Sequence, residues 1–195
     1  MATSFPSGLD ALTNPTSSDG LNSPDHAGQH ADANDAIEAL EAKVGVNGSA
    51  VATSLDYKLS NLGTYTSYTP TFASGVTVGN GTWVASYSVV NKIIFWQGTF
   101  TLGSTSSITG AVTMNLPSGY TFPSPDNGEI VGTVRMNPAG SVFYGGVREG
   151  STSTVSIFVF NASATYLSGT GLSATVPATW ANTNFMSIAF VAQLA

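Results

Sequence analysis

The chain has 195 residues, of which 42% are hydrophobic and only 8% are charged, and its formal net charge at pH 7 is −6. Soluble globular proteins carry about 25% charged residues, so this surface must be made mainly of Ser, Thr, Asn and backbone, a composition uncommon in cytoplasmic enzymes. The hydrophobic content is ample for a packed core and excludes wholesale disorder.

The negative charge lies in the N-terminal third of the chain. Residues 67–195 contain as many basic as acidic side chains, whereas residues 1–66 contain Asp10, Asp19, Asp25, Asp32, Asp35, Glu38, Glu41 and Asp56 against Lys43 and Lys58. Binding to nucleic acid or to an anionic membrane surface requires clustered Lys and Arg, so we expect neither function. The longest aliphatic and aromatic run, residues 93–96, is too short to span a bilayer, so we expect no membrane insertion.

Residues 1–30 are predicted to form an extended arm. Proline and glycine recur through it, at Pro6, Gly8, Pro15, Gly20, Pro24 and Gly28. Its few apolar side chains are Phe5, Leu9, Leu12 and Leu21. Such a segment cannot build a core of its own. We therefore expect it to lie along a partner, with these four side chains as its anchors.

Residues 31–66 are predicted to be a short helical segment. Ala33, Ile37, Leu40 and Val44 follow a heptad spacing, and a second stripe predicts another short helix over residues 49–62. Isolated helices shorter than about 15 residues are marginal in water, so these helices need neighbours. The residues predicted to mediate oligomerisation are Ile37, Leu40, Val44, Val51, Leu55, Leu59 and Leu62.

The ends of the first helix can also be predicted. Asp32 and Asp35 are expected in its first turn and Lys43 in its last, as the helix dipole favours. Gly45, followed by Asn47-Gly48, is expected to stop it.

Residues 67–195 are predicted to form an antiparallel β-sandwich or jelly roll, so the chain is mainly β. Aromatic and β-branched runs alternate with Gly, Pro, Asn and Ser turns at the spacing of short strands. The expected strands are 68–72, 82–89, 92–102, 108–116, 129–136, 142–148, 154–160 and 185–194. Within 95–102 the side chains alternate as in a half-buried strand. Asn80-Gly81 is predicted to be a hairpin turn, and Lys92 a hairpin residue.

The residue inventory argues against catalysis. The chain has no cysteine, and its two histidines, His26 and His30, both lie in the predicted arm, so residues 67–195 cannot hold a Ser-His-Asp or Cys-His site. A glycosidase-like pair would have to come from Asp126, Glu129 and Glu149, where surface acids in turns are the simpler interpretation. We expect no enzyme activity and no cofactor.

Metal binding at the two histidines is a minor hypothesis. Their i, i+4 spacing would present both imidazoles to one ion on a helix, and copies in a trimer could ring the axis. Pro24 and Gly28 argue against a helix there. The alternative is that both histidines hydrogen-bond the arm to its support.

Exposed aromatic side chains could contact sugars. For most aromatics of residues 67–195, packing in the core or at a subunit interface is the simpler expectation. The two in loops, Tyr120 and Tyr166, are the best candidates for a surface contact.

Two stretches resemble known proteins. Residues 21–45, LNSPDHAGQHADANDAIEALEAKVG, resemble the N-terminal region of bacteriophage minor tail and fibre-type proteins. The β region resembles the C-terminal heads of the same group through residues 68–72, 80–82, Tyr87 and 116–120. The resemblance implies a homotrimer on the virion surface. Its arms, residues 1–30, would dock onto tail or capsid proteins, and a short coiled-coil-like stalk would carry jelly-roll heads.

Two hypotheses for function follow from this resemblance. The first is a trimeric surface fibre whose heads attach to host-surface glycans, and the alternative is a capsid decoration protein that stabilises the shell. The first six residues have neither a basic nor an apolar stretch of a signal peptide. We therefore expect the protein to be made in the host cytoplasm and released by lysis.

Overall fold

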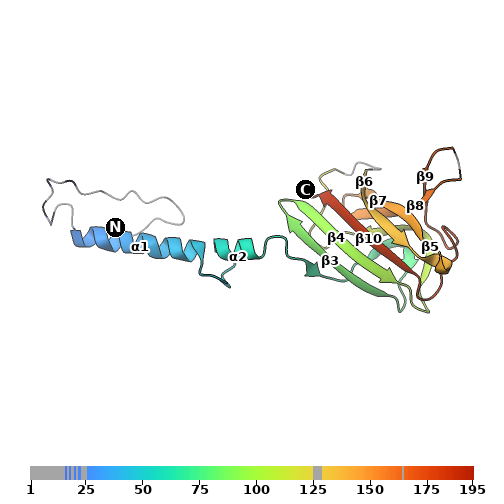
Figure 1. Ribbon diagram of the computed structural model, residues 1–195, viewed down its shortest axis with the longest axis horizontal. Helices are drawn as coiled ribbons and strands as arrows, with labels where there is room; N and C mark the ends of the chain where they lie inside the picture. Colours follow the sequence, from blue (N-terminus) through green and yellow to red (C-terminus); the bar gives the residue numbers. More distant parts are fainter. Residues whose placement is uncertain are drawn as a thin grey trace. The chain divides into compact units, whose positions relative to one another are not determined.

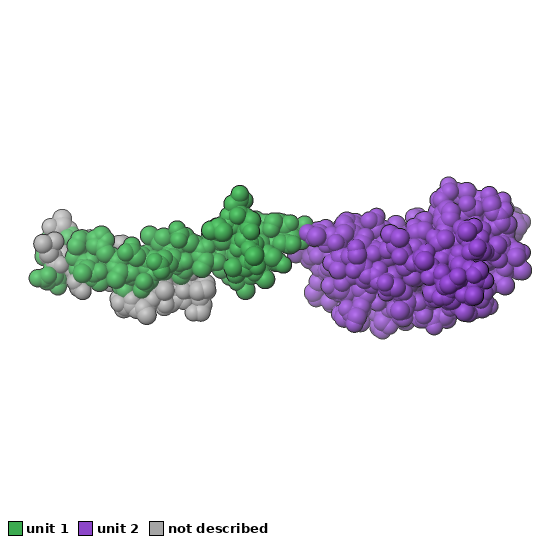
Figure 2. Space-filling view, turned by 90° about the horizontal axis from the view of Figure 1, so that it is seen from below, with its two compact units in different colours: residues 1–62 green, residues 63–195 purple. Residues whose placement is uncertain are grey.

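The computed structural model describes residues 16, 18, 20, 22, 26–124, 129–163 and 165–195. The chain divides into two compact units, residues 1–62 and residues 63–195, which Figure 2 colours separately. The four predicted anchors Phe5, Leu9, Leu12 and Leu21 lie outside the described residues.

The described part of the first unit contains two helices, α1 from His26 to Val44 and α2 from Leu55 to Ser60. Helix α1 begins within the predicted arm, so the expectation that Asp32 and Asp35 lie in its first turn is wrong, whereas Lys43 does lie in its last turn. Gly28 is accommodated within the helix, and Pro24 precedes it. Of the helices in the described ranges, none has the length and apolar character needed to cross a membrane.

Helix α1 stops at Gly45, as predicted, because the chain turns there in a way that only glycine tolerates well. Gly45 has φ of +86° and donates its N–H to Glu41 O at 2.7 Å. A Cβ at this position would lie 2.8 Å from Ser54 Cβ. Ser54 is fully buried and caps α2 by accepting a hydrogen bond from Tyr57 N at 3.2 Å. Helix α2 therefore starts at Leu55, later than the predicted 49–62.

Over its described residues the second unit is all β apart from one 3₁₀ turn over Pro138–Gly140. Its strands are β1 Thr66–Ser67, β2 Phe72–Thr77, β3 Thr82–Val90, β4 Ile93–Thr101, β5 Ser107–Asn115, β6 Ile130–Met136, β7 Phe143–Ser151, β8 Thr154–Asn161, β9 Ser168–Gly171 and β10 Phe185–Gln193. Seven of these lie within three residues of their predicted bounds. The prediction of a strand over 68–72 is wrong, since β2 begins at Phe72, and β1 and β9 were not expected.

All ten strands belong to one antiparallel, curled sheet in the order β1-β3-β4-β10-β6-β7-β8-β5-β2, with β9 paired to β8 (Figure 1). The sequence predicted a sandwich of two sheets. Instead β10 pairs with β4 on one side and β6 on the other, so it joins the two halves into one sheet. The curl brings the edge strand β2 back to β3, where the Phe72 and Trp83 ring centroids are 5.2 Å apart.

The core fills the inside of this half-barrel. In β4 the predicted alternation is confirmed, because Trp96 and Phe100 are 2% and 0% exposed while Phe95 is 38% exposed. Met186, Ile188 and other alternate residues of the neighbouring strand β10 complete this wall of the core.

The two predicted turns have different outcomes. Asn91 and Lys92, with φ of 47° and 64°, form the two-residue turn of the β3–β4 hairpin, so the assignment of Lys92 is confirmed. Asn80-Gly81 does form a turn, but not a hairpin, because β2 pairs with β5 rather than with β3. Asn80 Oδ1 instead accepts from Thr105 N at 2.9 Å, which ties the β2–β3 and β4–β5 loops together.

Candidate functional site

The candidate surface of the first unit is an apolar stripe along its helices. None of the residues of α1 or α2 is buried. The seven predicted oligomerisation residues are all exposed, by 44% for Val44 up to 61% for Leu59. The α1 members recur at steps of three and four residues, so they share one face of the helix. We call Ile37, Leu40 and Val44 with Val51, Leu55, Leu59 and Leu62 the apolar stripe.

In the second unit the strand register defines two ends. Gly63 lies beside Val90, and Leu194 N donates to Lys92 O at 2.6 Å, so the chain enters and finishes at the end that holds the β3–β4 turn. Because all strands are antiparallel, the β4–β5, β6–β7 and β8–β9 loops lie at the opposite end. We call these the entry end and the loop end.

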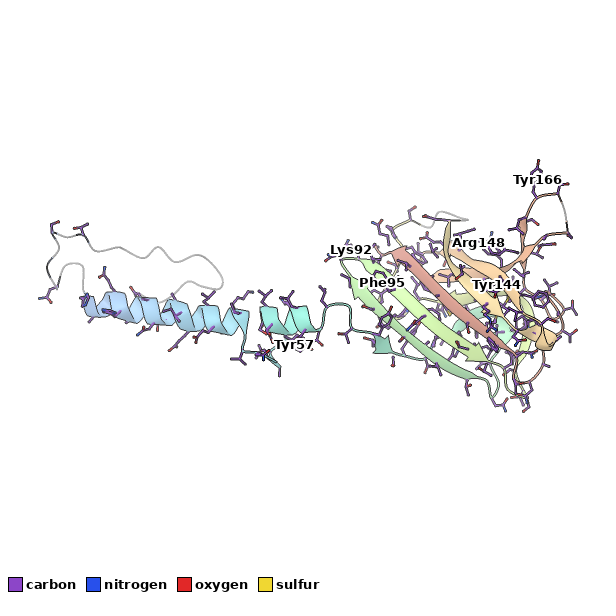
Figure 3. All side chains as sticks on the ribbon, viewed as in Figure 1. Tyr57, Lys92, Phe95, Tyr144, Arg148 and Tyr166 are labelled. Atoms are coloured by element: carbon purple, nitrogen blue, oxygen red, sulfur yellow. The ribbon has the colours of Figure 1, made fainter. Side chains whose placement is uncertain are left out.

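Tyr166 lies at the loop end, where the chain passes from β8 to β9. Its side chain is 83% exposed and projects away from the sheet (Figure 3). The next residue, Leu167, is 63% exposed. This position fits the prediction that Tyr166 is available for a surface contact.

Tyr120 has a different environment. It lies at the entry end, packs partly buried against the core, and its ring centroid is 5.7 Å from that of Tyr87 in an edge-to-face contact. Tyr120 does lie in a loop, as expected, but its side chain is only partly exposed. Its loop is joined to the residues that follow β10 by the hydrogen bond from Ala195 N to Thr121 O at 2.8 Å.

The sequence did not predict two hollows on the outer face of the sheet. The larger, of about 520 Å³, crosses β3, β4, β10 and β6 and lies between the exposed side chains of Val84 and Tyr144. Among the described residues that line it, Arg135 alone is charged, and its guanidinium lies 5.0 Å from the Phe185 ring centroid. The remaining lining is dominated by small hydroxyl-bearing and aliphatic side chains. We call it the outer-face hollow.

The second hollow, of about 430 Å³, lies beside β9 and is lined by Arg148, Phe160 and Leu167 among others. The Arg148 guanidinium lies 5.8 Å from the ring centroid of Phe158. Figure 3 shows Arg148 and Tyr144 on the same strand, β7. Both hollows combine aromatic or aliphatic walls with a single arginine, an arrangement suited to a weakly charged ligand.

The acidic residues considered for catalysis are only partly described. Asp126 lies outside the described residues. Glu129 and Glu149 line one hollow of about 440 Å³ at the entry end, where Glu149 is 7% exposed and Glu129 is exposed. Their backbones meet through Glu149 N and Glu129 O at 3.2 Å. Within the described ranges, no group of three or more His, Cys, Asp and Glu side chains is gathered closely enough to hold a metal ion.

An aromatic cluster between β1, β3 and β4 contains two tyrosines whose pKa values are raised. The Trp96 Nε1–H donates to the Tyr68 hydroxyl, and the Tyr68 and Tyr87 ring centroids are 5.1 Å apart. Burial raises the pKa of Tyr68 from 10.0 to about 12, against the opposing effect of the Trp96 hydrogen bond. Burial, followed by the neighbouring Tyr120, also raises the pKa of Tyr87.

We expect the free energy of unfolding to fall as the pH rises from about 10 to 12. Below pH 10 Tyr68 is neutral in both states, whereas between the two pKa values the unfolded chain releases a proton that the folded chain retains. Urea unfolding followed by tryptophan fluorescence at pH 8, 10 and 11 measures this decline. Tyr68→Phe should be less stable at pH 8, because Trp96 loses its acceptor, but should decline less steeply. An unchanged slope would contradict the assignment to Tyr68.

Comparison with known proteins gives no relative for this chain: no protein-family model, no curated protein and no solved structure matches it significantly. The functional argument therefore depends on the residues and on the geometry described above.

Proposed function

We propose that this chain is a non-enzymatic structural protein of a bacteriophage particle, a homotrimeric fibre on the virion surface. Residues 1–30 attach it to other virion proteins, and the helices of three copies form a short coiled-coil stalk. The β unit, one curled antiparallel sheet, serves as the head that attaches to host-surface glycans. The proposal includes no catalytic cofactor, no nucleic acid and no membrane insertion.

The observation that carries this proposal is the contrast between the two units. The β unit buries its own core, whereas the helices bury none of their residues and leave the apolar stripe exposed. Removing apolar surface from water contributes about 25 cal/mol per Å². At six residues α2 is too short to be stable in isolation, since even helices of about 12 residues are marginal. Identical helices that meet along the stripe would remove it from water, as in a coiled coil.

The head surface supports attachment to neutral sugars. The described part of residues 67–195 has only five charged side chains, Lys92, Glu129, Arg135, Arg148 and Glu149. Sugars without charge are bound by hydroxyl-rich and aromatic surfaces, and the outer-face hollow and the exposed Tyr144 and Tyr166 offer both. A single shallow site binds weakly, but three heads on one stalk gain affinity by multivalency.

The second candidate function, capsid decoration, is favoured by the length of the stalk. At 1.5 Å per residue the 19 residues of α1 span only about 28 Å. Such a stalk gives the heads little reach towards a cell, whereas it suits a protein that lies close to the shell and stabilises it. In this case the arm would span the junctions between capsid subunits.

Localisation on intact particles by cryo-electron microscopy or immunogold labelling, with copies counted, tests both candidates. Label in a few copies at the tail, with loss of adsorption when the protein is removed, supports the fibre. Label over the whole head, with loss of shell stability on removal, supports decoration. Absence of the protein from purified particles would contradict both. Cleavage of host polysaccharide by the purified chain would contradict the non-enzymatic assignment.

A further inference from the structure

The N-terminal end of α1 holds two histidine side chains that face each other. The Nε2 atoms of His26 and His30 are 3.1 Å apart, and the ring centroids are 4.4 Å apart at an interplanar angle of 85°. Both side chains are exposed. The sequence left this arrangement in doubt because of Pro24 and Gly28, but the helix includes both histidines, so they lie on consecutive turns.

The spacing of the two nitrogens matches that of adjacent donors around one metal ion. Imidazole nitrogens bind Zn²⁺ at about 2.0–2.1 Å, so neighbouring donors in its shell lie roughly 2.9–3.4 Å apart. Both nitrogens could therefore bind one ion if each ring turned to aim its Nε2 lone pair at that ion and the hydrogen bond between them were given up. The ring that donates this hydrogen bond would carry its proton on Nδ1 instead. Imidazole donors favour borderline ions such as Zn²⁺, Ni²⁺ and Cu²⁺.

One copy of the chain supplies only two such donors, because no third His, Cys, Asp or Glu side chain of its described residues lies close enough to bind the same ion. The position of the pair along the helix shows where further donors would come from. Counting back from Val44 in steps of four and three gives Leu40, Ile37, Ala33, His30 and His26. The histidines thus continue the apolar stripe to the start of α1, at heptad positions that face the axis of a coiled coil.

Copies related by a threefold axis along the helices run parallel, so equivalent residues meet in the same layer. Three His30 side chains and three His26 side chains would then form two triangles of nitrogens around the axis. Two such triangles, staggered, make an octahedral shell of six nitrogens. The 3.1 Å between the His26 and His30 Nε2 atoms of one chain is close to the edge length of such an octahedron.

We propose that His26 and His30 bind a divalent transition ion, with one ion shared by three copies at the N-terminal end of the stalk. The shared shell rests on the proposed trimer. It would fasten the helices together at the end where the apolar stripe gives way to polar residues.

The test uses the full-length chain, freed of metal with EDTA and dialysed at pH 8. Isothermal titration with Ni²⁺ and with Zn²⁺, together with metal analysis after dialysis, should give one ion per three chains. The ion should also raise the midpoint of thermal unfolding of the helical signal at 222 nm. His26→Ala and His30→Ala should each weaken binding more than about tenfold, since even residues that only support metal ligands contribute that much. Asp35→Ala, exposed on α1 on the side opposite the stripe, is the matched control and should bind as the native chain does.

Binding of one ion per chain would overturn the shared shell, and undiminished binding by a His26→Ala/His30→Ala variant would overturn the site. Absence of binding by the native chain would overturn both. Sedimentation of the metal-free chain reports the oligomeric state independently. A trimer that binds no ion refutes only the metal site, whereas a monomer in EDTA that forms no trimer with metal refutes the proposed stalk.

Discussion

Gly145→Ala is expected to destabilise the β unit severely. Gly145 lies in β7, between Val134 of β6 and Val159 of β8, and it is buried. A Cβ there would lie 1.8 Å from the Phe158 carbonyl oxygen and 2.8 Å from its carbon. These are backbone atoms of a paired strand, so no side chain can rotate to make room. The loss of stability should exceed about 4 kcal/mol, the range of the most damaging single substitutions.

Gly110→Ala is the matched control, because Gly110 also lies in a strand, β5, but has no neighbouring atom within 4 Å of the position that an alanine methyl group would take. Its unfolding free energy should stay within about 0.5 kcal/mol of the native value. Urea unfolding followed by tryptophan fluorescence measures both variants. Equal urea midpoints for Gly145→Ala and Gly110→Ala would show that the Phe158 backbone of β8 does not lie against Gly145 as described.

Local patterns in the sequence were enough to place most strands and the stripe. Alternation within 95–102 identified the buried face of β4 because side chains of a strand point alternately to its two faces. Steps of three and four residues identified Ile37, Leu40 and Val44 for the corresponding reason in a helix. Gly45 was predictable as a helix stop because its conformation is a local property.

What the sequence did not predict depends on pairing between distant segments. Nothing near β10 in the chain indicates that it lies between β4 and β6, and this pairing makes the fold one sheet instead of two. Asn80-Gly81 has the composition of a hairpin turn, yet no hairpin forms there because β2 pairs with β5. The same holds for the candidate surfaces. Tyr120 packs against Tyr87, and residues of β9 line the hollow beside Arg148. Both arrangements depend on contacts that form only when the chain folds.

Leu40→Asp is expected to abolish the trimer. In the proposed stalk three Leu40 side chains meet at the axis, so the substitution would bury three carboxylates close together, which is unfavourable both by desolvation and by repulsion. The native chain should sediment at three times its mass of 20.0 kDa, and the variant at 20.0 kDa. The variant should also lose helical signal at 222 nm, because its short helices then lack a partner.

Ala42→Asp provides the matched control, since it adds the same charge to an exposed residue of α1 two positions away, on the side opposite the stripe. It should remain trimeric. The β unit of both variants should unfold at the native urea concentration, because its core includes no residue of the helices. A native chain that is monomeric at micromolar concentration would contradict the trimer, and so would a trimer that tolerates Leu40→Asp. The stripe would then have to be covered by another protein of the particle, and self-association would no longer explain why the helices leave it exposed.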